Sequence, residues 1–343
     1  MWKLDPPSKE LLSWYQETML EGLKERIIKS NLLPAQIKNI LIPVRTVLVS
    51  AEHDLSILKR LLTDPPFESI QLSNELTIRM KKSILGATTK KYKAKDKGKS
   101  SIFDELRENL KSVFDYDGQL SQSKSRSYKI AHEQGRNSCT YCNRMYSFTV
   151  VHNEKVPTKF LVRTNDYNRK VRPQLDHWLD KSDYPLLSLN LYNLIPSCPI
   201  CNASVKHATR FSLATHIHPY LYDKAEPPFK FRLALNSEGN FIITIDDSQC
   251  TLAEKKMIRD LALQDIYGYH GELEGKDIYL WQLKNSPFYL ENSMKRLQRI
   301  FRRTPEEVYR MFFGIEYTPE NSLNRPFSKL KRDLLENLGI KTI

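Results

Sequence analysis

The spacing of apolar residues predicts helices in the first third of the chain. Apolar positions recur at helical offsets from Lys9 to about Ile28 and from Ile102 to Phe114. A third helical pattern runs from about Ala35 to Leu62, with a break expected at Pro43 because proline cannot donate to the helix ladder. We therefore expect a helical N-terminal region, residues 1–130.

Helix-capping signals continue this pattern toward the end of the chain. Thr251 and Glu254 have capping-box spacing, and so do Thr304 and Glu307, where Pro305 would occupy the first helical position. Gly314 is placed to end the second of these helices. The C-terminal region, residues 226–343, is thus expected to combine helices with one preceding hairpin, which alternating residues at 229–235 and 241–245 predict.

Short β patterns lie between these helical regions. Residues 145–151 and 159–163 are expected to form a hairpin, and residues 172–207 are expected to form strand, long loop, strand and helix. We assign residues 131–225 to a central core. The fold class that follows is α+β, with a small β-containing core flanked by N- and C-terminal helical regions.

Charge along the chain points to a polyanionic partner. Lys and Arg outnumber Asp and Glu by 53 to 40, giving a net charge of +13, which would favour nucleic acid or an anionic membrane surface. Two segments concentrate this charge: a lysine-rich stretch at 90–99, where a charged linker is the favoured interpretation, and a basic face at 295–303, which would serve equally as a phosphate contact or a solvated surface. No apolar stretch is long enough to cross a bilayer and no secretory signal opens the chain, so we expect a cytoplasmic protein without membrane association.

Four of the five cysteines form two Cys-x-x-Cys pairs. The pairs are Cys139 with Cys142 and Cys198 with Cys201, whereas Cys250 stands alone and is expected to be an ordinary buried thiol. Two such turns can supply four thiolates to one tetrahedral Zn²⁺ with no open position, which is the arrangement of structural zinc sites. A redox or scaffold role for the thiols is the alternative, and the zinc content of the protein would decide between them.

The stretch between residues 175 and 206 carries the most specific motif. It reads LDHWLDKSDYPLLSLNLYNLIPSCPICNASVK, in which an Asp-His pair is followed by Asn-Leu, then by Cys-x-x-Cys-Asn and a lysine. This pattern resembles the ββα-metal motif of HNH endonucleases. Its spelling is similar to that of HNH nucleases from bacterial anti-phage systems of the Septu-like and retron-associated kinds. The resemblance covers roughly residues 139–207 and implies a ββα-metal core beside a zinc knuckle.

The resemblance implies roles for four residues. His177 would be the general base, because a near-neutral imidazole can activate water at physiological pH. Asp176 would bind a catalytic Mg²⁺ or Mn²⁺, and both neighbours can serve one site only if the strand ends or bends there. Asn193 would fix the loop between the strands. Asn202 stands where the family has its final histidine and would supply the second oxygen ligand, with His207 as the less favoured substitute.

Weaker candidates surround this motif. Lys181 and Lys206 could contact phosphate oxygens, although lone lysines near a motif are more often solvated. His216 and His218 could form a second metal site or contact substrate, but a packed loop turn is the favoured interpretation.

The function expected from the resemblance is phosphodiester hydrolysis in nucleic acid. Family analogy favours DNA, and it also implies an effector role in anti-phage defence with an ATPase or sensor protein as a partner. A non-catalytic zinc-knuckle protein that binds nucleic acid would explain the cysteines and the charge equally well. It would not explain why Asp176, His177, Asn193 and Asn202 fall at HNH positions.

Overall fold

The structure is a computed structural model that describes residues 1–47, 50–88, 102–123, 125–134, 136–150, 171–206 and 209–340. It combines helices with two-stranded sheets, so the expected mixture of helical regions and small β elements is confirmed at that level. The predicted basic loop at 90–99 and His207 lie outside the described residues, as does most of the predicted hairpin at 145–163. Across the described part of the chain, no helix is both long enough and apolar enough to span a membrane.

The chain divides into two compact units whose segments alternate along the sequence. The cysteine unit contains Met1–Leu4, Gly135–Gln174 and Pro196–Ile343, and the N-terminal unit contains Asp5–Gln134 and Leu175–Ile195. The segment from Leu175 to Ile195, which holds Asp176, His177 and Asn193, therefore belongs with the N-terminal helices. The four cysteines and Asn202 belong to the other unit.

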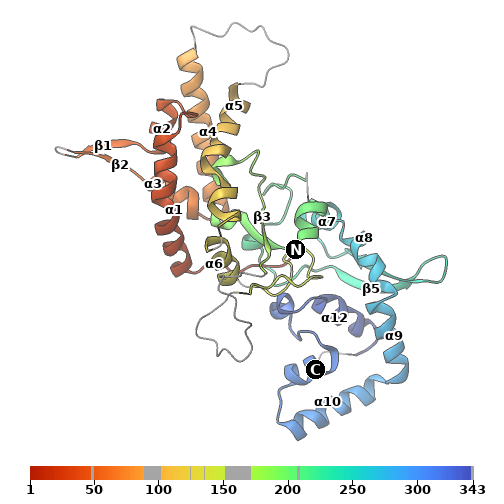
Figure 1. Ribbon diagram of the computed structural model, residues 1–343. Helices are drawn as coiled ribbons and strands as arrows, with labels where there is room; N and C mark the ends of the chain where they lie inside the picture. Colours follow the sequence, from red (N-terminus) through yellow and green to blue (C-terminus); the bar gives the residue numbers. More distant parts are fainter. Residues whose placement is uncertain are drawn as a thin grey trace. The chain divides into compact units, whose positions relative to one another are not determined.

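The N-terminal unit is a set of packed helices that surround the loop between two short strands (Figure 1). Its helices and first hairpin are α1 (Lys9–Lys29), α2 (Ala35–Leu41), β1 (Val44–Val47), β2 (Ser50–His53), α3 (Ser56–Thr63), α4 (Pro66–Thr88), α5 (Ile102–Phe114), the π-helix η1 (Asp117–Ser121) and α6 (Arg126–Glu133). The later segment contributes most of β3 (Gln174–His177), the 3-10 helices η3 (Pro185–Leu187) and η4 (Leu191–Asn193), and the start of β4 (Leu194–Ser197), which pairs with β3.

Helix α1 shows why the apolar spacing succeeded as a predictor. Its buried residues recur at helical offsets and include Tyr15, which is fully buried. The break expected at Pro43 is present, because α2 ends at Leu41, but the helical pattern expected after it was wrong where the antiparallel hairpin β1–β2 follows. Proline removes the donor that the helix needs, and the β-branched residues after it favour extended backbone.

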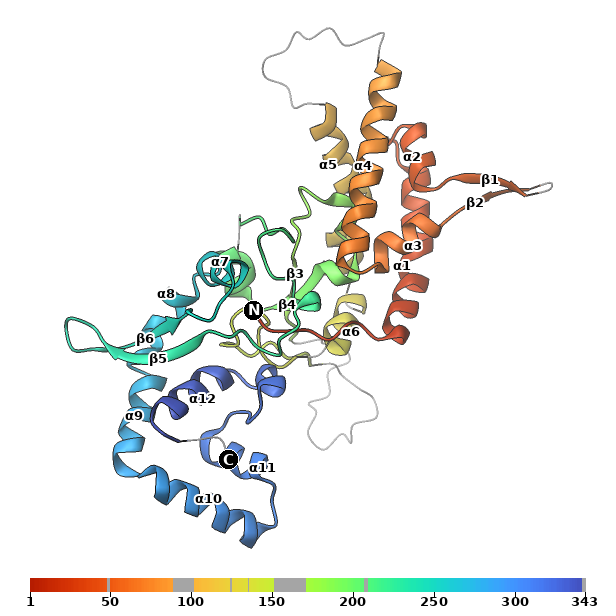
Figure 2. The same ribbon diagram turned by 180° about the vertical axis from the view of Figure 1, so that it is seen from behind.

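The cysteine unit carries a hairpin followed by a helical C-terminal region (Figure 2). Its further elements are the π-helix η5 (Ile200–Lys206), η6 (Pro219–Leu221), β5 (Lys230–Leu235), β6 (Phe241–Asp246), α7 (Leu252–Asp260), α8 (Leu263–Gly268), η7 (Tyr269–Gly271), α9 (Glu274–Lys284), α10 (Pro287–Phe301), α11 (Pro305–Phe313), η8 (Pro319–Asn324) and α12 (Ser328–Asn337). The β5–β6 hairpin confirms the predicted one, and Gly271 approaches it so closely that an added Cβ would lie 2.2 Å from the carbonyl oxygen of Phe241.

Both predicted capping boxes are present. Thr251 accepts from the backbone of Glu254 at the start of α7, and Thr304 does the same with Glu307 at the start of α11, which ends at Gly314 with φ 68°. Glu254 is buried and also accepts a hydrogen bond from Lys224 at 2.8 Å. Burial would raise the pKa of Glu254, but the hydrogen bonds from Lys224, Tyr222 and Thr251 outweigh it and lower the pKa to about 2.

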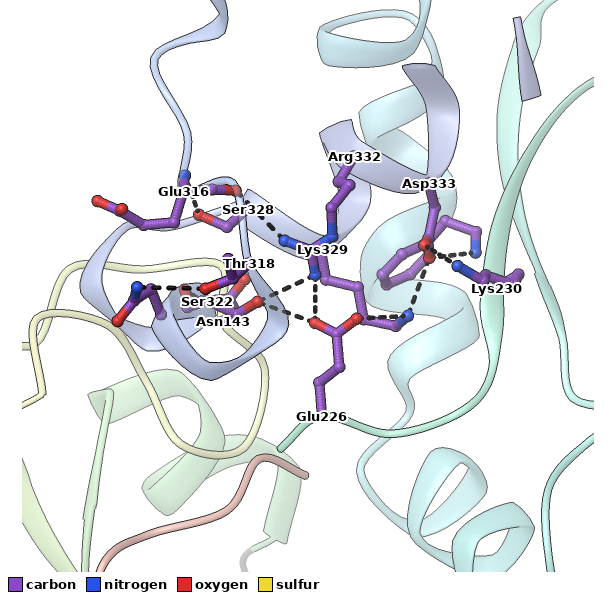
Figure 3. A network of polar contacts seen from close by, with 12 residues as sticks. Asn143, Glu226, Lys230, Glu316, Thr318, Ser322, Ser328, Lys329, Arg332 and Asp333 are labelled. Atoms are coloured by element: carbon purple, nitrogen blue, oxygen red, sulfur yellow. Dashed lines mark hydrogen bonds and ion pairs between the residues drawn. The ribbon is translucent and has the colours of Figure 1, made fainter. Parts of the chain in front are cut away.

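A buried ion network fixes α12 inside the cysteine unit (Figure 3). Lys329 and Asp333, 1% and 0% exposed, form an ion pair of 3.1 Å within the helix. Asp333 also accepts from Lys230 of β5 at 3.0 Å, and Glu226 pairs with both Lys329, at 3.5 Å, and Arg332. Because each charge meets an opposite one, the network offsets part of the cost of removing these groups from water.

Candidate catalytic and metal sites

The four paired cysteines converge in the cysteine unit. Their sulfur atoms all lie within 4.8 Å of one another, and all four residues are buried. Four thiolates about 2.3 Å from a tetrahedral zinc would have sulfurs about 3.8 Å apart, so the cluster has the donor type, number and spacing for that ion. Among the described residues, these cysteines are the one group of three or more His, Cys, Asp or Glu side chains that could share a metal.

Backbone amides point at the sulfurs, as they do in zinc knuckles. Cys198 donates its amide to the sulfur of Cys139 at 3.2 Å, and Arg144 donates its amide to the sulfur of Cys142 at 3.4 Å. Such bonds stabilise thiolate, which is the form that binds metal. The hydroxyl of Tyr267 donates to the carbonyl of Cys142, so α8 is tied to the turn that carries the first cysteine pair.

The residue after the first pair is adapted to the turn. Asn143 adopts the left-handed conformation, with φ 50°, which asparagine tolerates better than most residues. Its side-chain nitrogen donates to the Ser138 hydroxyl at 2.8 Å and to the Ser322 carbonyl at 2.7 Å. Ser322 in turn donates to Glu226 at 2.8 Å, which links the knuckle to the ion network of α12 (Figure 3).

The chemistry of four adjacent buried thiols also favours a cation. Burial raises the pKa of Cys139 well above its ordinary value, whereas hydrogen bonds from the neighbouring thiols lower that of Cys198. A divalent ion at the centre would bind all four as thiolates and remove this conflict.

His177 is held in one tautomer at the end of its strand. It is the last residue of β3, so the strand ends where the sequence analysis required it to end or bend. Its Nε2 lies 2.9 Å from the Ser188 carbonyl oxygen. A carbonyl can only accept, so Nε2 carries the proton and Nδ1 is the basic nitrogen of the neutral ring.

Asn193 closes the loop that carries Ser188. Its Oδ1 accepts from the Leu179 amide at 2.7 Å, and its Nδ2 donates to the carbonyls of Leu179 and Leu187, both at 3.1 Å. Its backbone carbonyl accepts from Trp178 at 2.9 Å. The side chain is 4% exposed, so these bonds form away from water and fix the two ends of the loop to each other.

Three side chains tie this loop and the strand before it to the N-terminal helices. Tyr15 of α1 donates its hydroxyl to the Leu189 carbonyl at 2.7 Å, and Asn190 donates to the carbonyls of Leu61 and Asp64, both at 3.0 Å. Tyr116 donates to the Leu175 carbonyl at 3.0 Å, and its ring meets the His177 ring edge-on at 4.3 Å. The N-terminal helices are therefore the scaffold of the histidine.

The two expected oxygen ligands belong to different units. Asp176, beside His177 on β3, is 5% exposed. In the cysteine unit, the Nδ2 of Asn202 donates to Oε1 of Gln174 at 2.7 Å. That hydrogen bond fixes the amide so that its Oδ1 is the atom left to act as a ligand, which suits a hard cation.

The two lysines named with the motif have local partners. Lys181 lies 3.2 Å from Asp117 and 5.2 Å from the centre of the Tyr116 ring. It lines a cavity of about 230 Å³ together with Tyr116, Ser188 and other residues of α5 and η1. Lys206 is 5% exposed and lies over the Phe211 ring, which favours a packing role for it. A phosphate contact by either lysine stays a prediction.

His216 and His218 are both buried. The Nε2 of His216 donates to Asp260 at 2.9 Å, and its Nδ1 accepts from Thr215 at 2.8 Å, so both ring nitrogens are engaged. Burial lowers the pKa of His218 to about 3, and its Nδ1 accepts from the Tyr220 amide. These contacts agree with the interpretation of a packed loop turn.

Sequence reasoning did not find the residues that support the site. Ser188, Tyr116 and Gln174 touch the predicted residues, yet no local pattern marks them, because each contact joins positions far apart in the chain or uses a backbone carbonyl. Comparison with protein-family models, with curated proteins and with solved structures found no match to this chain.

Proposed function

We propose that this protein is a metal-dependent HNH endonuclease that hydrolyses phosphodiester bonds of nucleic acid, with DNA as the expected substrate. The observation that carries the proposal is the state of His177. A histidine beside a buried aspartate has its Nε2 proton committed to the Ser188 carbonyl and its Nδ1 kept as a base. The loop that carries Ser188 is closed by Asn193, the residue to which the resemblance assigns the support of this histidine.

In this proposal, His177 takes a proton from the attacking water. The Ser188 carbonyl holds the ring while it becomes imidazolium, because the Nε2–H bond persists and strengthens when the ring is charged. The rigid loop limits the geometries that the ring can adopt, and the Tyr116 ring restricts its rotation on one side. Positioning of this kind contributes to catalysis by preparing the base before substrate arrives.

The resemblance assigns Asp176 and Asn202 as the residues that would supply oxygen ligands to a catalytic divalent ion. Mg²⁺ keeps several waters and takes few protein ligands, so one carboxylate and one amide oxygen suffice. When bound, the ion would neutralise charge on the scissile phosphate and the leaving oxygen. Zinc in the cysteine cluster would be structural, since four sulfurs leave no open position.

The resemblance also supports a role as the effector of a bacterial anti-phage system, with an ATPase or sensor protein as partner. Expression with and without neighbouring genes during phage challenge tests this role. Protection that depends on His177 would support it, and protection that is unchanged by His177→Ala would contradict it.

Purified protein incubated with plasmid, linear duplex, single-stranded DNA or RNA in Mg²⁺ or Mn²⁺ tests the nuclease itself. His177→Ala should abolish cleavage while zinc content and folding stay normal. His132→Ala is the matched control, since His132 is an exposed histidine of the same unit. Cleavage that survives in His177→Ala would remove that residue from its role. Binding without cleavage by the wild type would favour the non-catalytic zinc-knuckle protein.

A further inference from the structure

Helix α10 has one face buried in the cysteine unit and one face open to solvent. Leu290 and Met294, each 1% exposed, pack into an apolar cluster with residues of α11 and α12. Both views of the molecule draw α10 on the side of α12 that lies away from β5 (Figures 1 and 2). The opposite face, which we call the outer face of α10, consists of Phe288, Tyr289, Asn292, Lys295, Arg296, Arg299 and Ile300, all exposed.

This outer face is positively charged. Between residues 287 and 303 there are five cations and one anion, Glu291. Glu291 lies 2.6 Å from Lys295. Arg296 and Arg302 have no carboxylate within 4.0 Å in the described part of the chain, and Arg299 touches only the Lys295 carbonyl, at 3.4 Å. Guanidinium groups that the protein leaves uncompensated attract phosphates.

The same face exposes aromatic rings, which a merely solvated charged helix does not need. Phe288 is 76% exposed and Tyr289 is 60% exposed. Phe301, at the far end of α10, is 55% exposed but lies on the side of Leu290, eleven residues before it, and so outside this face. Beyond Phe301 the surface is hollowed: Arg303, Glu307, Arg310 and Met311 line a space of about 350 Å³ with it, and Glu307 pairs with Arg303 at 3.2 Å. Aromatic rings therefore stand at the start of the outer face, and its arginines follow them along the helix.

Exposed rings and arginines on one helix face match the chemistry of an unpaired nucleic-acid strand. Its bases are free to stack on aromatic side chains, and its phosphates meet the cations. A duplex hides its bases inside the stack and would leave the exposed rings without a partner. The 15 residues of α10 span about 22 Å, which is long enough to follow several nucleotides.

We propose that the outer face of α10 binds single-stranded nucleic acid, with Arg296 and Arg299 contacting phosphates and Phe288 and Tyr289 stacking on bases. The inference rests on the proposed nuclease function, because it names the strand that the nuclease would hold. Binding itself needs no catalysis, so the two proposals can fail separately.

The test measures binding by fluorescence anisotropy with a labelled oligothymidylate about 20 nucleotides long and with a duplex of equal length. The full chain is used in a His177→Ala background, so that no cleavage interferes. Arg296→Ala with Arg299→Ala should weaken oligothymidylate binding at least tenfold and reduce the slope of log affinity against log salt by about 1.4, or roughly 0.7 for each phosphate contact. Phe288→Ala with Tyr289→Ala should weaken it at least tenfold without changing that slope.

A matched control removes two positive charges elsewhere in the same unit. Lys3→Ala with Arg259→Ala should leave affinity within twofold, since both side chains are exposed and lie outside α10. Because the altered residues are exposed, thermal melts should agree among all variants. The proposal is overturned if the α10 variants bind oligothymidylate as the wild type does, which would assign the face to a protein partner. Equal affinity for duplex, unaffected by loss of the rings, would also overturn it. If the wild type cleaves nucleic acid but the α10 variants bind oligothymidylate normally, the binding role of α10 is refuted and the proposed nuclease function is not.

Discussion

Replacing Asn193 by alanine should open the loop that positions His177. The substitution removes three buried hydrogen bonds and leaves the Leu179 amide and the carbonyls of Leu179 and Leu187 without those partners. At about 1 kcal/mol for each bond, the loop should lose about 3 kcal/mol of local stability. A loss of about 3 kcal/mol corresponds to an opening equilibrium roughly 100-fold more favourable. Asn193→Asp should be at least as damaging, because it would face two carbonyls with a carboxylate.

Hydrogen–deuterium exchange of the segment 178–193, followed by mass spectrometry, measures this opening directly. We expect exchange roughly 100-fold faster in Asn193→Ala, in line with about 3 kcal/mol of lost protection. Asn31→Ala is the control, because Asn31 is exposed and lies in the same unit. Exchange within threefold of the wild type in Asn193→Ala would show that the loop does not depend on this side chain, and the account of His177 positioning would have to be abandoned.

Three further substitutions test other parts of the structure. Cys139→Ser should lower zinc content and the melting temperature, whereas Cys250→Ser should change neither. Equal zinc content in the two variants would argue against metal binding by the four-cysteine cluster. The ionised carboxylate of Glu254 stabilises the fold at pH values above its ordinary pKa of 4.5, and this stabilisation is lost as the pH falls toward its folded pKa of about 2. In Glu254→Gln, the free energy of unfolding should therefore depend less on pH in this window than it does in the wild type. Gly271→Ala should lower the melting temperature, since its Cβ would lie 2.2 Å from a backbone oxygen, while Gly268→Ala, with nothing within 4 Å, should not; similar melts for the two would refute the close approach.

Local signals explain what the sequence predicted well. The capping boxes at Thr251 and Thr304 depend on residues three positions apart, and the periodicity of α1 depends on one helix face, so both could be read from short windows. The Cys-x-x-Cys spacing likewise predicted two turns that each present two thiols. The four cysteines do converge in one cluster, which could hold a metal such as zinc.

Contacts between segments far apart in the chain explain what the sequence did not predict. Nothing near Tyr116 indicates that its ring would meet His177, which is 61 positions later in the chain. Nor does the composition of residues 175–195 show that this segment packs with α3, α4 and α5. Such pairings are decided by the whole set of buried surfaces, which short patterns do not contain.

The alternation of the two units along the chain has a consequence for synthesis on the ribosome. The N-terminal unit has all of its segments once Ile195 has emerged, so it can begin to fold while most of the other unit is still untranslated. The cysteine unit must wait for the long segment after Pro196, including α12. The segment that carries His177 can therefore begin to pack before the residues that complete the cysteine unit have been made.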